Sequence, residues 1–191
     1  MTDGIEHLNI DSAMALWDWL EHHHASKDSR WLVTWKKAPG APYVSRDDVL
    51  DALIAYGWID GRRMKHADPA RTMQLIAPRK QGIWAQTYKD RAARLIAEGR
   101  MRPPGQAAID AAKATGQWEE WSDVDALEVP QELSDALALR PGAAEWFTQA
   151  APSYRRNVLR YLRGAKRPET RAKRIAQIAD HAARGERVPQ Y

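Results

Sequence analysis

A stripe of arginines near the C-terminus is the part of this sequence whose residue types and spacing are best suited to chemistry. Separations of four, three and four residues place the first four on one face of a helix, and two more follow a proline: Arg156, Arg160, Arg163 and Arg167, then Arg171 and Arg174. A guanidinium fork binds phosphate or carboxylate through two hydrogen bonds, and a helix N-terminus at Pro168 favours an anion there. The stripe predicts a face that holds an anionic small molecule or an acidic protein partner.

Two other interpretations of the stripe stay open. Its arginines could instead pair with acidic residues of the same chain, as is common in charge-rich helical proteins. Nucleic acid is a further candidate partner, because the sequence pI is about 9.4 and one helix face is basic. The sequence has no RNP-type aromatic motif, no zinc-finger spacing and no recognisable DNA-reading turn. Nucleic acid is therefore less favoured than a small anion or an acidic protein.

A second group in the N-terminal half combines a carboxylate with cations and a tryptophan: Asp60, Arg62, Arg63, Arg79, Lys80 and Trp84. If Asp60 and Arg79 meet between strands, they line a tryptophan-walled pocket for a small polar ligand. Burial would raise the pKa of the Asp60 carboxyl, which could then orient a ligand or act as a general base. The alternative is a turn residue that bonds its own backbone. This group predicts an enzyme or a small-ligand-binding protein, without identifying catalytic residues.

Metal and cofactor sites find no support in the sequence. His22, His23 and His24 are consecutive, and neighbouring residues on a helix point about 100° apart, so the three cannot converge on one ion. No Asp or Cys completes a standard ligand spacing. P-loop, G-x-G-x-x-G and G-x-S-x-G motifs are also missing from the sequence. We expect neither a metal nor a cofactor.

Charge is distributed unevenly along the chain. Residues 151–191 contain eleven Lys or Arg and three acidic residues, a net charge of +8, whereas the whole chain is +4. Residues 1–150 therefore carry about −4, from 18 basic and 22 acidic residues. This asymmetry indicates that a negatively charged partner would bind near the C-terminus.

Composition limits the class of protein. With 191 residues, of which 44% are hydrophobic and 28% charged, the chain fits one domain or a small domain with a helical extension. The sequence has no cysteine, which excludes disulfides and thiol nucleophiles. No signal peptide is visible, and the longest nearly apolar run, residues 52–59, is too short to span a bilayer. We expect a soluble, cytoplasmic protein that does not insert into membranes.

Helix and strand patterns alternate over the first half of the chain. Apolar residues at helical spacing begin after Asp11 or Ser12, either of which can cap a first helix. Residues 31–37 are rich in β-forming types and predict a strand. Ser45 and Asp48 form a variant capping box, which predicts the start of a second helix.

Two further strands and a long helix complete the N-terminal half. Residues 58–59 predict a short strand that turns at Asp60-Gly61, and residues 71–77 alternate as another strand. The helix that follows ends at Gly99, where glycine suits a helix C-terminus. These patterns predict a small α+β unit with a short antiparallel sheet.

The second half of the chain is helical by pattern. Prolines suit the first turns of its helices, as at Pro103 and Pro168, and Ser153 is placed to cap the helix that carries the stripe. The fold class is therefore α+β, with an α+β domain over residues 1–100. Residues 101–191 form a helical region that ends in a basic helix pair.

Three blocks, in this order, resemble the YdeI/OmpD-associated (OmdA) family, also labelled bacteriocin-protection proteins. They are residues 57–62, residues 72–80 with Trp84 and Tyr88, and residues 151–160 with the 166–175 motif. The resemblance covers nearly the whole chain. It implies an α+β N-terminal part, C-terminal helices, and a link to envelope stress, to tolerance of bacteriocins or cationic peptides, and to a porin. It implies no set of catalytic residues.

Together these observations favour a non-enzymatic binding or stress-tolerance protein that holds an anion on the arginine stripe. The first alternative is an enzyme or small-ligand-binding protein built around Asp60 and Arg79. The second is sequence-nonspecific nucleic-acid binding.

Overall fold

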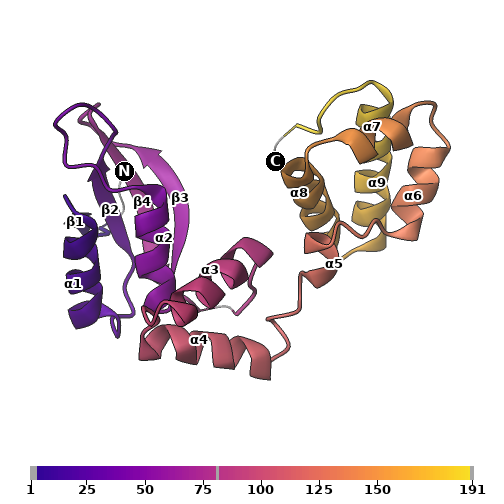
Figure 1. Ribbon diagram of the computed structural model, residues 1–191. Coiled ribbons are helices and arrows are strands. Elements are labelled where there is room, and N and C mark those ends of the chain that lie inside the picture. Colours follow the sequence, from indigo (N-terminus) through magenta and orange to yellow (C-terminus); the bar gives the residue numbers. More distant parts are fainter. Residues whose placement is uncertain (1–3, 81, 190–191) are drawn as a thin grey trace. The chain divides into compact units, whose positions relative to one another are not determined.

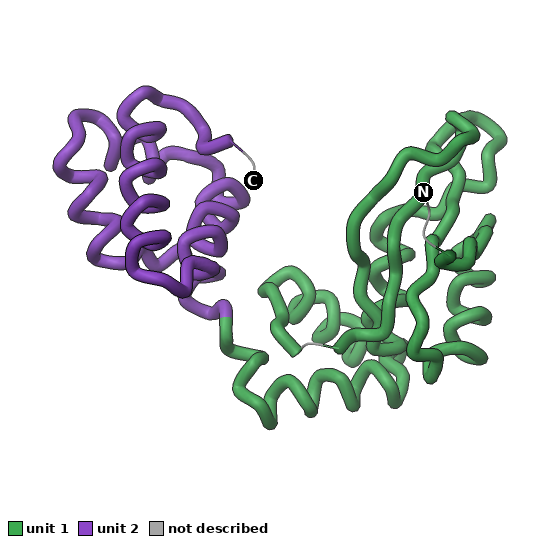
Figure 2. Tube along the Cα trace, turned by 180° about the vertical axis from the view of Figure 1, so that it is seen from behind, with its two compact units in different colours: residues 1–120 green, residues 121–191 purple. Residues whose placement is uncertain are grey.

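The structure is a computed structural model that describes residues 4–80 and 82–189 (Figure 1). The chain forms two compact units: unit 1 ends at Glu120 and unit 2 begins at Trp121 (Figure 2). The sequence predicts a domain boundary near Met101. Beyond that residue, helix α4 (Pro103–Ala114) lies within unit 1, because Ile109 and Ala112 are buried in the core of that unit.

Unit 1 contains a four-stranded sheet with the order β1-β2-β4-β3. Its strands are β1 (His7–Asn9), β2 (Arg30–Trp35), β3 (Trp58–Lys65) and β4 (Arg71–Pro78). Strands β2 and β3 both run antiparallel to β4, but β1 pairs with β2 in parallel. The prediction of an antiparallel sheet is therefore wrong for β1. Helix α1 (Ala13–His23) connects β1 to β2, and such a crossover brings the chain back in the same direction.

Strand β3 does not turn at Asp60-Gly61, as the sequence predicts. It continues to Lys65, and the chain turns between Lys65 and Arg71 instead. The register with β4 shifts between Asp60 and Arg63. Such a bulge adds a residue to one strand and bends it, and glycine is common at bulges. The glycine at position 61 therefore marks an irregularity inside the strand rather than its end.

Helices α1 and α2 (Arg46–Ala55) cover one face of this sheet (Figure 1). The main core lies between them and the sheet, where Leu20 of α1, Leu53 of α2 and Ile76 of β4 are buried. The predicted capping box at the start of α2 is confirmed: Ser45 and Asp48 each bond the backbone N–H of the other. Because the box satisfies N–H groups that a helix start leaves unpaired, it stabilises the start of α2 at Arg46.

Helix α3 (Gln86–Ala97) and α4 lie at one end of the sheet (Figure 1). Helix α4 approaches the end of α2 so closely that a Cβ atom at Gly105 would lie 2.3 Å from the carbonyl oxygen of Ala55. Only glycine permits this contact between two backbones. The close approach ties residues beyond Met101 to the core of unit 1.

Unit 2 is entirely helical over its described part. Its helices are α5 (Ser122–Asp125), α6 (Gln131–Ala138), α7 (Ala143–Gln149), α8 (Pro152–Arg163) and α9 (Pro168–Ala183). Helix α8 begins two residues earlier than the sequence predicts, with Ala151 rather than Ser153 at its N-cap. Leu133, Phe147 and Ile178 form part of its own core. The α+β class with a helical C-terminal half is confirmed.

No helix in residues 4–80 or 82–189 is long and apolar enough to cross a membrane.

Candidate functional site

Carboxylates of unit 2 engage half of the predicted arginine stripe. The three ion pairs are Arg160–Asp125 at 3.2 Å, Arg163–Asp123 and Arg171–Glu132. The side chain of Asp125 is only 4% exposed, so the carboxylate depends on nearby donors to offset its lost hydration. These three arginines hold helices α8 and α9 against α5 and α6.

The acidic partners come from the segment that directly precedes the basic one. Residues 121–150 add six acidic residues and one arginine to the C-terminal segment, so unit 2 as a whole has twelve basic and nine acidic residues. Its net charge is +3, far below the +8 of residues 151–191 alone. The charge asymmetry of the sequence is therefore largely neutralised within one folded unit.

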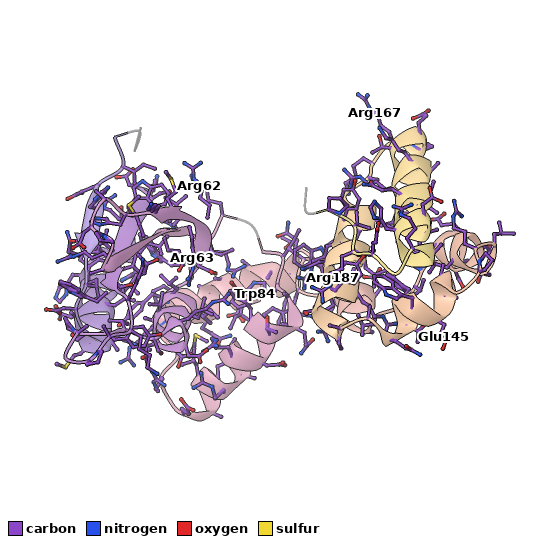
Figure 3. All side chains as sticks on the ribbon, turned by 90° about the horizontal axis from the view of Figure 1, so that it is seen from above. Arg62, Arg63, Trp84, Glu145, Arg167 and Arg187 are labelled. Carbon is purple, nitrogen blue, oxygen red and sulfur yellow. The ribbon has the colours of Figure 1, made fainter. Side chains whose placement is uncertain are left out.

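The other three arginines of the stripe have different surroundings. Arg156 donates to the backbone carbonyl of Asp125 at 3.4 Å, and Arg174 donates to the carbonyl of Tyr161. Arg167 is exposed at the start of α9 (Figure 3), and its side chain has no hydrogen bond or ion pair to the described residues. The six residues therefore form a network along α8 and α9 with one free cation at its end, rather than a uniform open face.

In unit 1, Asp60 lies at the centre of a hydrogen-bonded group that joins β3, β4 and α3. Its Oδ1 accepts a bond from the hydroxyl of Tyr88, and its Oδ2 accepts from Nε2 of Gln74 at 2.9 Å. The amide oxygen of Gln74 in turn accepts from Nη2 of Arg63 at 3.4 Å. A continuous polar chain thus runs from Tyr88 through Asp60 and Gln74 to Arg63.

Both oxygens of Asp60 are engaged in this chain. Burial and the neighbouring Asp60 carboxylate raise the pKa of Tyr88 to about 12, so Tyr88 stays protonated at neutral pH and keeps donating to Asp60. A carboxylate that already accepts two bonds is suited to orienting its neighbours. The arrangement favours a positioning role for Asp60 over the general base that the sequence suggests.

Arg79 and Trp84 lie beside this group, and they pack on each other. The guanidinium carbon of Arg79 is 4.1 Å from the centre of the Trp84 ring and 5.5 Å from that of Tyr88. Burial lowers the pKa of Arg79, an effect that Tyr88 and Asp60 oppose. Trp84 is fully buried, with 0% of its surface exposed. It is therefore a core residue that supports the cluster.

Arg62 does not join the cluster. Its guanidinium carbon lies 5.5 Å from the ring centre of Trp31, and Figure 3 shows Arg62 at the edge of unit 1, away from Trp84. The bulge in β3 explains why Arg63, and not Arg62, lies beside Gln74. Asp60 pairs with Ile76 and Arg63 with Gln74, so Arg63 takes the face that regular alternation would assign to Arg62.

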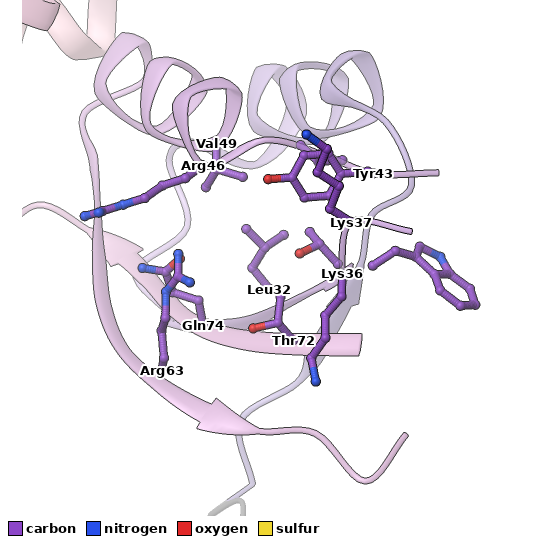
Figure 4. A pocket seen from close by; sticks show the side chains of 12 residues that line it. Leu32, Lys36, Lys37, Tyr43, Arg46, Val49, Arg63, Thr72 and Gln74 are labelled. Atoms are coloured by element: carbon purple, nitrogen blue, oxygen red, sulfur yellow. The ribbon is translucent and has the colours of Figure 1, made fainter. Parts of the chain in front are cut away.

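A cavity of about 330 Å³ opens on the other side of Gln74, between the sheet and the start of α2 (Figure 4). We call it the basic pocket. Its lining residues are Leu32, Thr34, Trp35, Lys36, Lys37, Tyr43, Val44, Arg46, Val49, Arg63, Thr72 and Gln74. Four of these residues are cationic, and none of the described residues that line the pocket is acidic.

The cations of the basic pocket are mostly not neutralised. Lys36 donates to the backbone carbonyl of Pro69 at 2.7 Å, and Figure 4 shows its ammonium group directed away from the pocket. Arg63 bonds the uncharged amide of Gln74. Lys37 and Arg46 make no hydrogen bond or ion pair with any residue that the structure describes. Three of the four cations are thus available to an anion.

The rest of the pocket is mixed in character. Leu32 and Val49 are buried apolar residues, whereas Thr34 and Gln74 are buried polar ones. Tyr43, 45% exposed, stands at the rim. A concave site with an apolar floor and a few polar groups is typical of small-ligand pockets.

The sequence missed this pocket because its cations are spread over the loop before α2, the first residue of α2 and the bulged strand. The pair Lys36-Lys37 before a proline-glycine loop is the one local signal. Which side of β3 carries Arg63 depends on the bulge. The convergence is a product of the tertiary fold.

Groups of three or more residues that could hold a metal ion do not occur in the described part of the chain. Each ring of the three consecutive histidines bonds a backbone carbonyl of α1 through Nδ1: His22 with Asp18 at 2.8 Å, His23 with Trp19 at 2.7 Å and His24 with Leu20 at 3.2 Å.

Two family models match the chain, one in each unit. Residues 8–108 match a domain of unknown function, DUF8412, and residues 126–185 match the model described as Bacteriocin-protection, YdeI or OmpD-Associated (OmdA). The predicted resemblance to OmdA is confirmed over the segment that holds its third block, whereas the first two blocks lie in the DUF8412 match. No curated protein and no solved structure matches the chain.

Proposed function

We propose that this chain, which belongs to the DUF8412 family and carries an OmdA segment in unit 2, is a binding protein that holds a small anionic ligand in the basic pocket of unit 1. The observation that carries the proposal is one cavity with three available cations, Lys37, Arg46 and Arg63, and no carboxylate among its described lining residues. Cations left without a counter-charge in a partly enclosed site favour an anion from solution.

The polar chain behind the pocket supports binding rather than catalysis. Tyr88 and Gln74 occupy both oxygens of Asp60, which leaves that carboxylate to hold Gln74 in place. Gln74 in turn orients Arg63 at the pocket wall. Side chains fixed before the ligand arrives lose less entropy on binding, which increases affinity.

The description of the OmdA model, which matches unit 2, names bacteriocin protection. We propose that anion binding by unit 1 serves this protective role. The arginine stripe contributes less in this proposal than the sequence suggests, because Asp123, Asp125 and Glu132 already neutralise part of it. Its exposed end at Arg167 is the part that we propose contacts an acidic protein partner.

A thermal-shift screen of the full chain tests the proposal. Phosphorylated and carboxylated metabolites, free amines and a short DNA duplex are compared at constant ionic strength. We expect small anions to raise the melting temperature, since a ligand at 100 times its Kd stabilises the folded state by about 2.7 kcal/mol.

The matched variants are Lys37→Gln/Arg46→Gln in the pocket and Arg167→Gln in unit 2. We expect the pocket variant to lose the anion response and the Arg167 variant to keep it. The proposal fails if no small anion stabilises the wild type, or if DNA alone does so.

A further inference from the structure

We infer, on the basis of the proposed function, that the ligand of the basic pocket is a phosphate monoester of a hydroxylated small molecule, with its phosphate between Arg46 and Arg63. The arrangement of the cations, the size of the cavity and the polar groups of its floor each bear on this ligand class.

The two arginines approach one end of the pocket from opposite walls. Arg46 comes from the first turn of α2 and Arg63 from β3, and Figure 4 shows both guanidinium groups at the same end of the cavity. A planar carboxylate matches the fork of one guanidinium. A phosphate monoester is nearly dianionic at neutral pH and has three acceptor oxygens in different directions. Two forks from opposite walls therefore fit the phosphate better.

Neither arginine is held by a carboxylate that a ligand would have to displace. Arg63 bonds the Gln74 amide, and Arg46 makes no hydrogen bond or ion pair within the described ranges. The two acidic residues that follow Arg46 in sequence and the one bonded to Gln74 are engaged elsewhere: Asp47 pairs with Arg91, Asp48 caps α2, and Asp60 bonds Tyr88 and Gln74. Because Asp48 occupies the N-terminus of α2, the phosphate would be held by side chains rather than by the helix end.

The cavity is larger than a bare ion requires. At roughly 30 Å³ per water molecule in the liquid, 330 Å³ corresponds to about eleven waters. The space beyond the two arginines therefore admits an organic body attached to the phosphate.

The walls beyond the arginines indicate what that body carries. Thr34 and Thr72 are the hydroxyl-bearing threonines of the lining. Figure 4 shows Lys37 and Tyr43 at the end of the pocket opposite the two arginines. Donors and acceptors in close proximity suit a body with several hydroxyl groups, such as a sugar. A ring above Leu32 and Val49 would cover the apolar part of the floor.

Isothermal titration calorimetry of the full chain at constant ionic strength tests this inference with four probes: ribose 5-phosphate, ribose, inorganic phosphate and citrate. We expect ribose 5-phosphate to bind at least roughly tenfold more tightly than inorganic phosphate, and ribose alone not to bind. Arg46→Gln and Arg63→Gln should each weaken ribose 5-phosphate binding roughly 10- to 100-fold, since each removes a charge-assisted hydrogen bond.

Arg62→Gln is the matched control, because Arg62 neighbours Arg63 in sequence but packs over Trp31. It should bind ribose 5-phosphate like the wild type, and far-UV circular dichroism should show all three variants folded. If citrate binds through Arg46 and Arg63 and ribose 5-phosphate does not, the ligand class is wrong while anion binding stands. Equal affinity for inorganic phosphate and ribose 5-phosphate would show that the pocket does not bind the hydroxylated part of the ligand, and this would overturn the inference. If no anion binds, the proposed function fails as well.

Discussion

The arginine stripe of unit 2 and the basic pocket of unit 1 both contain arginines, but the surroundings of these arginines differ. In unit 2, Arg160, Arg163 and Arg171 contact carboxylates of helices α5 and α6. In unit 1, Arg46 and Arg63 line a cavity whose described walls hold no acidic residue. The denser cluster in the sequence is thus the less available one in the fold. A charge is open to a partner only where folding brings no counter-charge to it.

The difference has a simple origin in each unit. The acidic segment 121–150 folds against the basic helices that follow it, so the arginines are neutralised by carboxylates 35 to 40 positions away within the same unit. In unit 1 the acidic residues near the pocket are used for other purposes, such as helix capping by Asp48 and the ion pair of Asp47 with Arg91. Pairing in one unit stabilises helix packing, and its absence in the other leaves cations around the pocket that we propose binds an anion.

Replacing Gly105 with alanine should have the largest effect on stability. The variant tests whether residues 101–120 stabilise unit 1 rather than unit 2. A Cβ atom there would lie 2.3 Å from the Ala55 oxygen and 2.5 Å from that of Ile54, so α4 must move away from α2. We expect a loss of about 3 kcal/mol in the stability of unit 1. Urea denaturation followed by hydrogen exchange in each unit measures the effect. Ala107→Ser, on the exposed side of α4, should change stability by less than about 0.5 kcal/mol.

The Arg160→Leu variant tests whether the arginine stripe serves helix packing rather than anion binding. Asp125 would lose a cation while its side chain stays 4% exposed, so we expect unit 2 to lose about 2 kcal/mol. Anion affinity, measured by calorimetry, should not change, because this arginine serves packing. A variant that kept its stability but lost anion binding would show that the stripe is the binding face after all.

Removal of the Asp60 carboxylate tests whether the polar chain positions the pocket. Asp60→Ala deprives the Gln74 amide and the Tyr88 hydroxyl of their acceptor. We expect affinity for the ligand to fall about fivefold, or ~1 kcal/mol, because Arg63 is held less firmly. Asp60→Asn keeps one acceptor oxygen and should recover most of the affinity. Unchanged binding in Asp60→Ala would show that the polar chain does not position the pocket.

The smallest effect concerns the pH dependence contributed by Tyr88, since it appears only in alkaline solution. Its pKa is raised from 10.0 to about 12 in the folded protein, so its stabilising contribution is fully present below pH 10 and is lost as the pH rises through about 12. The stability difference between wild type and Tyr88→Phe should be constant at neutral pH and shrink above pH 10. Chemical denaturation at several pH values measures it, and a difference that grows with pH would contradict this sign.

Local rules account for much of the fold. The capping box at Ser45, the proline start of α9 at Pro168 and the alternation along β4 depend on neighbours in sequence, and each is present. The failures involve distant partners. β1 joins β2 in parallel, and β3 continues through Gly61 because β4 is there to pair with it.

The same division holds for the candidate site. The sequence by itself determined which residues could attract an anion, and it proposed Asp60, Arg79 and Trp84 as members of one candidate group. The tertiary structure decided which cations remain available: it brought Asp123, Asp125 and Glu132 to the arginine stripe. It also placed Arg63, rather than Arg62, beside Gln74 through one irregularity in β3. Charge is a property of residue type, whereas its neutralisation depends on distance and burial, which only the folded chain sets.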